Sequence, residues 1–337
     1  MLNFNKEKFT DYMEFNYGLK EQINKVVDQF FDEGFDNLFL IGIGGTAAYM
    51  EQYGNILKTK SNIKVYVENA AEFMAVGNKQ FTQNSVVVVS SESGNTKEII
   101  ALLKDLKAKK IRTLGFVAKE KSPIGDELEH CIIYRGCDET FFDHTNMVKL
   151  LMTARFMYDA GDFPEYDKFV AQLANMIPAL VAMRESFEPK AAEFANKYCD
   201  EKYHMLTGSG NLMGGVYSMG MCILEEMQWI STQSVSCAEF FHGALEMLTK
   251  DTSLMLFKGE DGTRPLADRV EAFAKKISTN VSVFDTKEYE FAGLDNQYRE
   301  LVCPLAAGSF FERIAKHLED IRNHDLSIRR YYKVLEY

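Results

Sequence analysis

The stretch LFLIGIGGTA, residues 38–47, decides the fold that this chain is expected to adopt. An unbroken apolar run leads into glycines, and a segment with helical spacing then continues to about Leu57. A short strand without polar alternation is buried on both faces, which is typical of a parallel sheet with helices on either side. The glycines allow a tight turn from strand to helix. This stretch therefore predicts an α/β domain.

Further apolar runs repeat the alternation of strand and helix along the chain. Strands are predicted at residues 65–67, 86–90, 113–117, 132–134, 204–207, 254–257 and 281–284. Helices are predicted within residues 1–34, where Gly34 is placed to end the segment, and at 145–160, 164–198 and 214–229. We expect an α/β architecture with mainly parallel sheets, each covered by helices on both faces as in a flavodoxin-like three-layer sandwich.

The pattern restarts in the second half of the chain. LIGIGGTAAYM (40–50) and LTGSGNLMGGVYSM (206–219) both place a glycine turn between a strand and a helix. VVVSSESGNTKEI (87–99) and LMLFKGEDGTRPL (254–266) both follow a strand with a loop that contains Glu and Gly. Two such pairs in the same order indicate a duplicated domain. The predicted limits are an N-terminal helical segment at 1–34, a first domain at 35–163 and a second domain with a C-terminal tail at 164–337.

The composition indicates which partners are unsuitable and in which cellular compartment the protein is expected. Hydrophobic residues make up 46% of the 337 residues and the formal net charge is −11, which argues against nucleic acid or an anionic membrane as the main partner. The N-terminus lacks the pattern of a signal peptide, and no apolar run is long enough to cross a bilayer. The six cysteines are scattered without paired spacing. Free thiols in the cytoplasm, and no zinc site, are therefore expected.

Two loops predict different ligands, a dinucleotide or a sugar phosphate. GIGGTA (42–47) fits the relaxed dinucleotide fingerprint G-x-G-x-x-A, and Glu68 ends a later strand where a ribose-binding acid would lie. SSESGNT (90–96), called here the serine loop, instead supplies hydroxyl and N–H donors before a helix, which suits a phosphate. A sugar-phosphate site requires this second loop and a dinucleotide site does not. Either loop could also serve only as a turn or an N-cap.

Together with VYVENAAEF (65–73), these loops resemble the sugar isomerase (SIS) domain, over nearly the whole chain after the N-terminal helices. The resemblance implies two tandem SIS domains with no metal or nucleotide cofactor. It also implies that a sugar phosphate contacts residues Gly45, Thr46, Ser91, Glu92, Ser93, Thr96 and His144. Two positions depart from the isomerase domain of glucosamine-6-phosphate synthase: Ala47 replaces the usual Ser, and residues 144–146 read His-Thr-Asn in place of Ser-Thr-Lys.

Glu226 and His242 supply a carboxylate and an imidazole, the groups that a proton shift between neighbouring carbons needs. Their separation, 242 − 226 = 16, matches the Glu-to-His spacing in glucosamine-6-phosphate synthase and in deglycases of phosphorylated Amadori compounds. The resemblance implies Glu226 as the base and His242 as the acid. Glu239 could instead be the base or could orient His242. A solvated helix face and a structural histidine are the alternatives.

EMQW (226–229), EFFHG (239–243) and the tail from Leu326 onward resemble the fructosamine-6-phosphate deglycases. In that family the active site commonly lies between subunits and the tail contributes, so a homo-oligomer with a shared active site is implied. Arg329, Arg330 and Lys333 are then candidates to contact phosphate or carboxylate, although a terminal charge cluster can equally be solvated surface.

The expected partner is a phosphorylated sugar-amine, cleaved to glucose 6-phosphate and a free amine. A glucoselysine-6-phosphate deglycase, an aldose–ketose isomerase of amino sugar phosphates and a sugar-phosphate sensor without catalysis stay open.

Overall fold

The computed structural model describes residues 1–136, 142–332 and 334–336, and its contacts divide the chain into two compact units. The N-terminal unit consists of Lys6–Ile177 and Gly293–Leu301. The C-terminal unit consists of Met1–Asn5, Pro178–Ala292 and Val302–Tyr337. The N-terminal helices thus belong to the first unit. The sequence-predicted domain limits stay a prediction.

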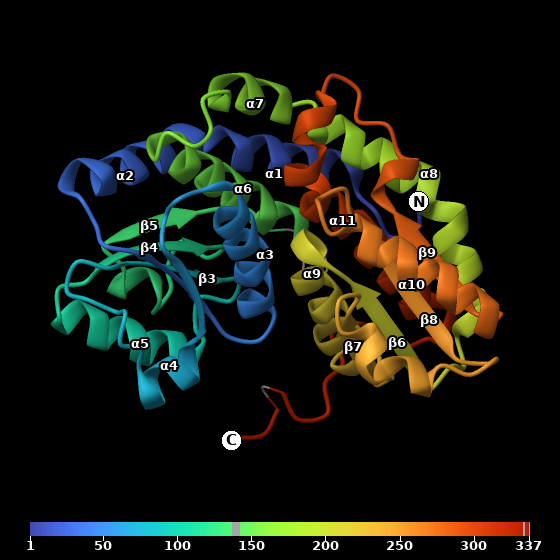
Figure 1. Cartoon of the computed structure of the whole chain (residues 1–337). Helices are drawn as coiled ribbons and strands as arrows, with labels where there is room; N and C mark the ends of the chain where they lie inside the picture. The colour runs from blue at the N-terminus through green and yellow to red at the C-terminus, as the bar shows by residue number, and fades with distance from the viewer. Residues whose placement is uncertain (137–141, 333, 337) are drawn as a thin grey trace. The chain divides into compact units, whose positions relative to one another are not determined.

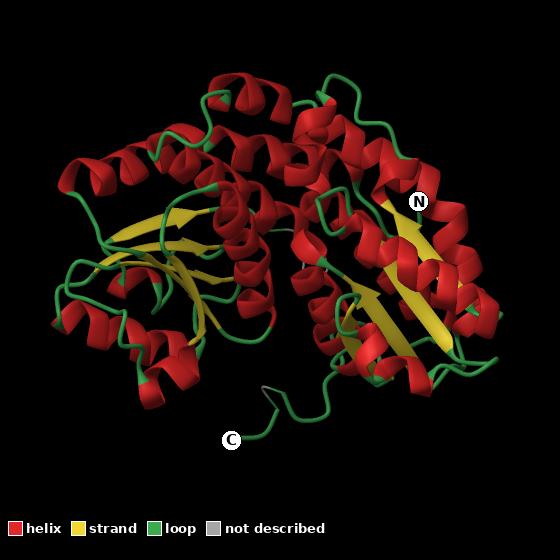
Figure 2. Cartoon of the chain, viewed as in Figure 1, coloured by secondary structure: helices red, strands yellow, loops and turns green. Residues whose placement is uncertain are grey.

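The N-terminal unit contains a parallel sheet with the strand order β2-β1-β3-β4-β5. Its strands are β1 (Leu38–Gly42), β2 (Val65–Asn69), β3 (Val86–Ser91), β4 (Arg112–Val117) and β5 (His130–Ile133). Its helices are α1 (Lys6–Gly18), α2 (Lys20–Glu33), α3 (Gly45–Lys60), α4 (Ala70–Val76), α5 (Lys97–Ala108), α6 (Phe142–Asp159) and α7 (Tyr166–Leu173). One face of the sheet is covered by α4 and α5, and the other by α3 and α6, as Figures 1 and 2 show.

Alternate apolar side chains build the core between this sheet and α5. Phe39 and Val87 point from neighbouring strands into a fully buried cluster with Leu102 and Leu106 of the helix. The apolar residues of α5 recur at helical spacing and are buried, so this packing fixes the start of the helix relative to the end of β3. The serine loop connects the two and is positioned by both.

The C-terminal unit contains a second parallel sheet with the order β7-β6-β8-β9. Its strands are β6 (Tyr203–Gly208), β7 (Ser231–Ser236), β8 (Ser253–Lys258) and β9 (Val281–Asp285). Its helices are α9 (Met213–Ser218) and α10 (Arg264–Ile277), together with the parts of α8 (Met176–Tyr198) and α11 (Arg299–Ile321) that belong to this unit. Helix α10 covers one face, and rings on the other pack closely, with Phe257 4.9 Å from Phe284 and 5.1 Å from Phe311. The predicted parallel α/β architecture is confirmed in both units.

The segment 1–34 is helical as predicted and contains two helices, which meet at Leu19, and Gly34 ends the second with a φ of +72° as expected. The region 164–198 is also helical as predicted and divides into α7 and α8. The prediction of one helix at 214–229 needs correction. The segment 214–229 contains the short α9 and a π-helical stretch η3 (Met219–Glu225), and Trp229 has a φ of +55°. Apolar periodicity alone does not reveal such breaks.

Within the described residues, no helix combines the length and the apolar character needed to span a membrane. The described cysteines are free thiols, and Cys137 lies outside the described residues.

Candidate functional site

The glycine turn after β1 depends on glycines at two positions. A Cβ atom at Gly42 would lie 2.5 Å from the backbone nitrogen of Ala47, so only glycine allows the helix to start this close to the strand. Gly44 has a φ of +59°, which disfavours residues with a side chain. Gly45 begins α3, and the Thr46 hydroxyl closes the turn by donating to the Ile43 carbonyl at 2.9 Å and accepting from its N–H at 3.1 Å.

The serine loop lies beside this turn, because β1 and β3 are neighbouring parallel strands whose carboxyl ends share one edge of the sheet. The buried Ser91 hydroxyl accepts from the Gly94 N–H at 3.0 Å and lies 3.3 Å from the Thr96 hydroxyl. Thr96 directly precedes α5, whose first N–H groups lack intrahelical partners. Ser93 is half-buried in the same loop. Hydroxyls and N–H groups at a helix N-terminus form an arrangement that accepts a phosphate.

Glu92 connects this loop to a buried group that the sequence analysis missed. The Tyr134 hydroxyl donates a hydrogen bond to the Glu92 carboxylate, and burial followed by the charge of Glu92 raises the pKa of Tyr134 well above its usual value. The charge of Glu92 also acts on Lys149, a residue of α6 that is only 1% exposed. Burial lowers the pKa of Lys149 to about 7, although the charge of Glu92 opposes this shift. One signal was available: Lys149 interrupts the apolar run MVKLLM (147–152).

His144 lies in the core of the N-terminal unit. Its side chain is fully buried against the rings of Phe9 and Tyr12, with centroids 5.4 and 5.9 Å away. Its backbone carbonyl accepts from the Asn16 side chain at 3.3 Å. These contacts fix the imidazole in the packing of α1 against α6. A contact between His144 and substrate stays a prediction.

In the C-terminal unit, Glu226 directly follows the π-helical stretch η3, and its side chain is 27% exposed. The Nε atom of Arg329, from the C-terminal tail, donates to the Glu226 carboxylate at 2.7 Å. Arg330 is exposed and places its guanidinium 4.0 Å above the ring centre of Trp229. The structure thus brings the predicted base together with the tail. Lys333 lies outside the described residues.

Glu239 directly precedes the short 3₁₀ helix η4 (Phe240–His242), which follows β7, and His242 is its last residue. Both side chains are exposed, and the His242 N–H donates to the Glu239 carbonyl at 2.9 Å. Glu226 precedes β7 and His242 follows it. Because six strand residues at about 3.3 Å each separate the two ends of β7, the backbone carries Glu226 and His242 to opposite ends of this strand.

The loop after β8 occupies the position in the C-terminal sheet that the serine loop occupies in the first sheet, beside the strand with the glycine turn. Here the carboxylate of Asp261 accepts from the N–H groups of Asn211 at 3.0 Å and Thr263 at 2.8 Å. The Thr263 hydroxyl bonds to the same carboxylate and to Ser209. The Asp261 carboxylate therefore already accepts hydrogen bonds from the donors that a bound phosphate would use. The N-terminal serine loop is the better candidate for a phosphate.

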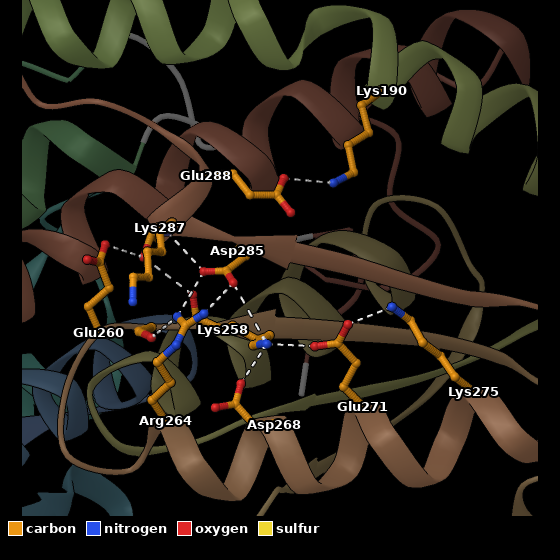
Figure 3. Close-up of polar contacts among 12 residues, drawn as sticks. Lys190, Lys258, Glu260, Arg264, Asp268, Glu271, Lys275, Asp285, Lys287 and Glu288 are labelled. Carbon is orange, nitrogen blue, oxygen red and sulfur yellow. Dashed lines mark hydrogen bonds and ion pairs between the residues drawn. The ribbon is translucent and has the colours of Figure 1, made fainter.

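Charged groups next to this second loop neutralise one another, as Figure 3 shows. Lys258 lies 2.6 Å from Asp268 and from Glu271, and Arg264 forms two contacts with Asp285 at 2.9 and 2.5 Å. Burial lowers the pKa of Lys258, but its hydrogen bonds with Asp268 and Glu271 outweigh burial and the net shift is upward. The start of α10 is thus held by a closed set of ion pairs.

A cavity of about 200 Å³ in the N-terminal unit lies apart from the predicted residues. It is lined by Lys60, Met157, Asp162, Phe163, Glu165, Gln297, Tyr298, Glu300 and Leu301. None of the predicted site residues lines it, so it does not define the candidate site.

Known proteins share the parallel α/β fold of this chain. Residues 34–160 match the model of the SIS domain. A solved structure from Bacillus subtilis, described as a phosphosugar isomerase, superposes with a TM-score of 0.88 at 27% identity and covers 95% of this chain and 99% of its own. The C-terminal domain of glucosamine-fructose-6-phosphate aminotransferase from Francisella tularensis shares the fold, with a TM-score of 0.80 at 11% identity over 94% and 95% of the two chains. The first half of the chain is thus similar to the SIS domain, and the similarity to the Bacillus subtilis structure extends over nearly the whole chain, in agreement with the predicted tandem arrangement.

Its curated relatives include deglycases. The fructosamine deglycase FrlB of Bacillus subtilis (strain 168) is 28% identical over 94% of this chain and 98% of its own length. The fructoselysine 6-phosphate deglycase of Escherichia coli (strain K12) is 23% identical over 92% of this chain and 89% of its own length. The predicted resemblance to SIS-domain deglycases is confirmed.

Proposed function

We propose that this chain is an enzyme that cleaves a 6-phosphorylated sugar-amine of the Amadori type, such as fructoselysine 6-phosphate, into glucose 6-phosphate and a free amine. The observation that carries the proposal is the similarity to two proteins named as deglycases over nearly the whole of this chain. The serine loop supplies donors for the phosphate, and Glu226 and His242 supply the base and the acid.

The proposed reaction is two proton transfers followed by hydrolysis. Glu226 removes a proton from C1 of the ketosamine while His242 protonates the oxygen at C2, which gives an enaminol. Protonated Glu226 then returns a proton to C2, and the nitrogen lone pair forms a C1=N Schiff base. Water adds to C1, the C–N bond breaks, and glucose 6-phosphate and the amine leave. The contact with Arg329 orients the Glu226 carboxylate before the first step.

The site is proposed to be shared between copies of the chain. Glu226 and His242 lie beyond opposite ends of β7, which supports a reaction in which one copy supplies the base and another the acid. A closed twofold dimer would then contain two such sites.

Three substrates test the reaction and its specificity. Purified protein is incubated with fructoselysine 6-phosphate, glucoselysine 6-phosphate or fructose-asparagine 6-phosphate, and hexose phosphate and amine are measured together. We expect stoichiometric release from at least one substrate, with turnover at least about 100-fold lower in Glu226→Gln and in His242→Asn. Glu246→Gln, another exposed glutamate of the same unit, is the control and keeps full turnover. Turnover that persists in both variants contradicts the proposed roles.

Mixing the two inactive variants tests the shared site. If base and acid come from different copies, half of the dimers in a random mixture are heterodimers, and each contains one intact site. About a quarter of the wild-type activity returns. If both groups come from one copy, the mixture stays inactive. Conversion of glucose 6-phosphate to fructose 6-phosphate without amine release would instead identify an aldose–ketose isomerase.

A further inference from the structure

Lys149 is a buried amine that lacks, among the described residues, the hydrogen-bond acceptors that buried lysines usually have. Its side chain is 1% exposed, in α6. Among the described residues, no group accepts a hydrogen bond from its Nζ atom. The nearest aromatic contact is the ring of Tyr49, whose centre lies 5.4 Å away. A buried ammonium without hydrogen-bond acceptors is costly, and proteins rarely keep one unless it has a role.

Lys258, the other buried lysine among the described residues, has the ion pairs that a structural lysine usually forms. Lys258 has Asp268 and Glu271 at 2.6 Å and Asp285 at 3.8 Å (Figure 3). Burial lowers the pKa of Lys258, but the hydrogen bonds and charges of Asp268 and Glu271 outweigh burial and raise the pKa above its usual value. Lys149 has the opposite shift, because burial dominates and lowers its pKa to about 7. Lys258 is a permanent cation that fixes a loop. Lys149 is poised to change charge near neutral pH.

The surroundings of Lys149 connect it to the serine loop. Glu92, the charged group that acts on its amine, lies in this loop between Ser91 and Ser93. Tyr49 faces the amine from α3, and Tyr134, which follows β5, donates to Glu92. On α6 itself, the buried Asp143 and His144 lie one to two turns before it.

A phosphate bound at this loop needs a compensating charge. The helix N-terminus and the hydroxyls supply partial charges, whereas a phosphate monoester at pH 8 carries close to two negative charges. Glu92 adds a third negative charge to the same loop. Protonation of Lys149 would offset part of this repulsion in a site where charges are weakly screened.

Building on the proposed function, we propose that Lys149 is the cation of the serine-loop phosphate site and takes up a proton when a phosphate monoester binds there. Without a ligand the amine of Lys149 is then largely neutral. When a phosphate monoester binds, the amine takes up a proton, and the resulting positive charge holds the phosphate.

Calorimetry measures this proton directly. Glucose 6-phosphate and, separately, inorganic phosphate are titrated into the full-length protein at pH 8 in two buffers with different heats of ionisation. With a pKa of about 7 in the empty protein and above about 9 in the complex, uptake is about 0.8 proton per ligand. We expect Lys149→Met to lose this uptake and to bind at least about 10-fold more weakly. Lys104→Met, which removes an exposed lysine of α5, is the matched control and keeps both.

Each result decides the inference. A wild-type protein that binds either ligand without proton uptake overturns it, and this measurement does not depend on the folding of any variant. Uptake that persists in a folded Lys149→Met protein also overturns it. Protein that binds glucose 6-phosphate with proton uptake but releases no amine from the three sugar-amines contradicts the proposed deglycase reaction and leaves this inference standing. Absence of binding by either ligand contradicts the phosphate site itself.

Discussion

Replacing Lys149 by methionine should make the protein more stable at neutral pH while it weakens anion binding. The folded-state pKa of about 7 lies below the reference value of 10.5. The folded state therefore binds fewer protons than the unfolded state between pH 7 and 10.5, so this lysine destabilises the fold most below pH 7 and least above pH 10.5. The ionisation cost is roughly 4 to 5 kcal/mol at pH 6.5 and roughly 1 to 2 kcal/mol at pH 9.5, a difference of about 3 kcal/mol. Methionine fills a similar volume without a charge.

We expect Lys149→Met to raise the free energy of unfolding of the N-terminal unit, with a gain about 3 kcal/mol larger at pH 6.5 than at pH 9.5. Urea unfolding followed by circular dichroism at both pH values measures this difference, and Lys104→Met should change by less than about 0.5 kcal/mol at either. A gain that does not depend on pH, or a loss of stability at pH 6.5, would refute the assignment of Lys149 as an uncompensated buried amine.

Two further predictions concern the C-terminal unit. Burial lowers the pKa of His204 to about 4. Below pH 6.5 the unfolded state therefore binds one proton at His204 that the folded state does not bind until the pH falls to about 4. The free energy of unfolding should thus fall by about 2 to 3 kcal/mol between pH 7.5 and pH 4.5. Urea unfolding of His204→Gln should lack most of this loss, and an equal loss in both proteins contradicts the prediction. Asp261→Ala removes the acceptor for the N–H groups of Asn211 and Thr263 and should cost about 2 to 3 kcal/mol, against about 1 kcal/mol for Asp261→Asn. Equal losses in thermal unfolding would contradict a carboxylate that fills this loop.

The strands that are easiest to predict from the sequence are those whose residues are all buried. Residues 38–42 and 86–91 are buried throughout, so their side chains are apolar nearly without interruption. Strand β7, Ser231–Ser236, lies at an edge of its sheet, is at most half-buried, and contains mostly polar residues. An edge strand with polar side chains lacks the apolar pattern that identifies central strands. The limits of this strand could not be predicted from the sequence.

Some features of the candidate site could also be predicted from the sequence, and others could not. The serine loop is local, so its hydroxyls and the following helix could be recognised within seven residues of sequence. The contact between Glu226 and Arg329 joins positions 103 residues apart, and only folding reveals that the tail reaches this carboxylate. Lys149 was overlooked for a related reason. The apolar run around it is a signal of burial, but the absence of hydrogen-bond acceptors among the described residues depends on the folded structure.

The two units differ at the corresponding loop. Both sheets place a loop beside a glycine turn, at the edge where parallel sheets bind ligands. In the N-terminal unit the loop presents hydroxyls, and the nearby amine of Lys149 is not held by acceptors among the described residues. In the C-terminal unit Asp261 satisfies the corresponding donors, and Lys258 and Arg264 are fully paired with carboxylates. A loop that satisfies its own charges is stable but gains little from a ligand. A loop with an uncompensated charge is less stable, but a bound ligand of opposite charge restores this stability, and for this reason we propose the first loop as the phosphate site.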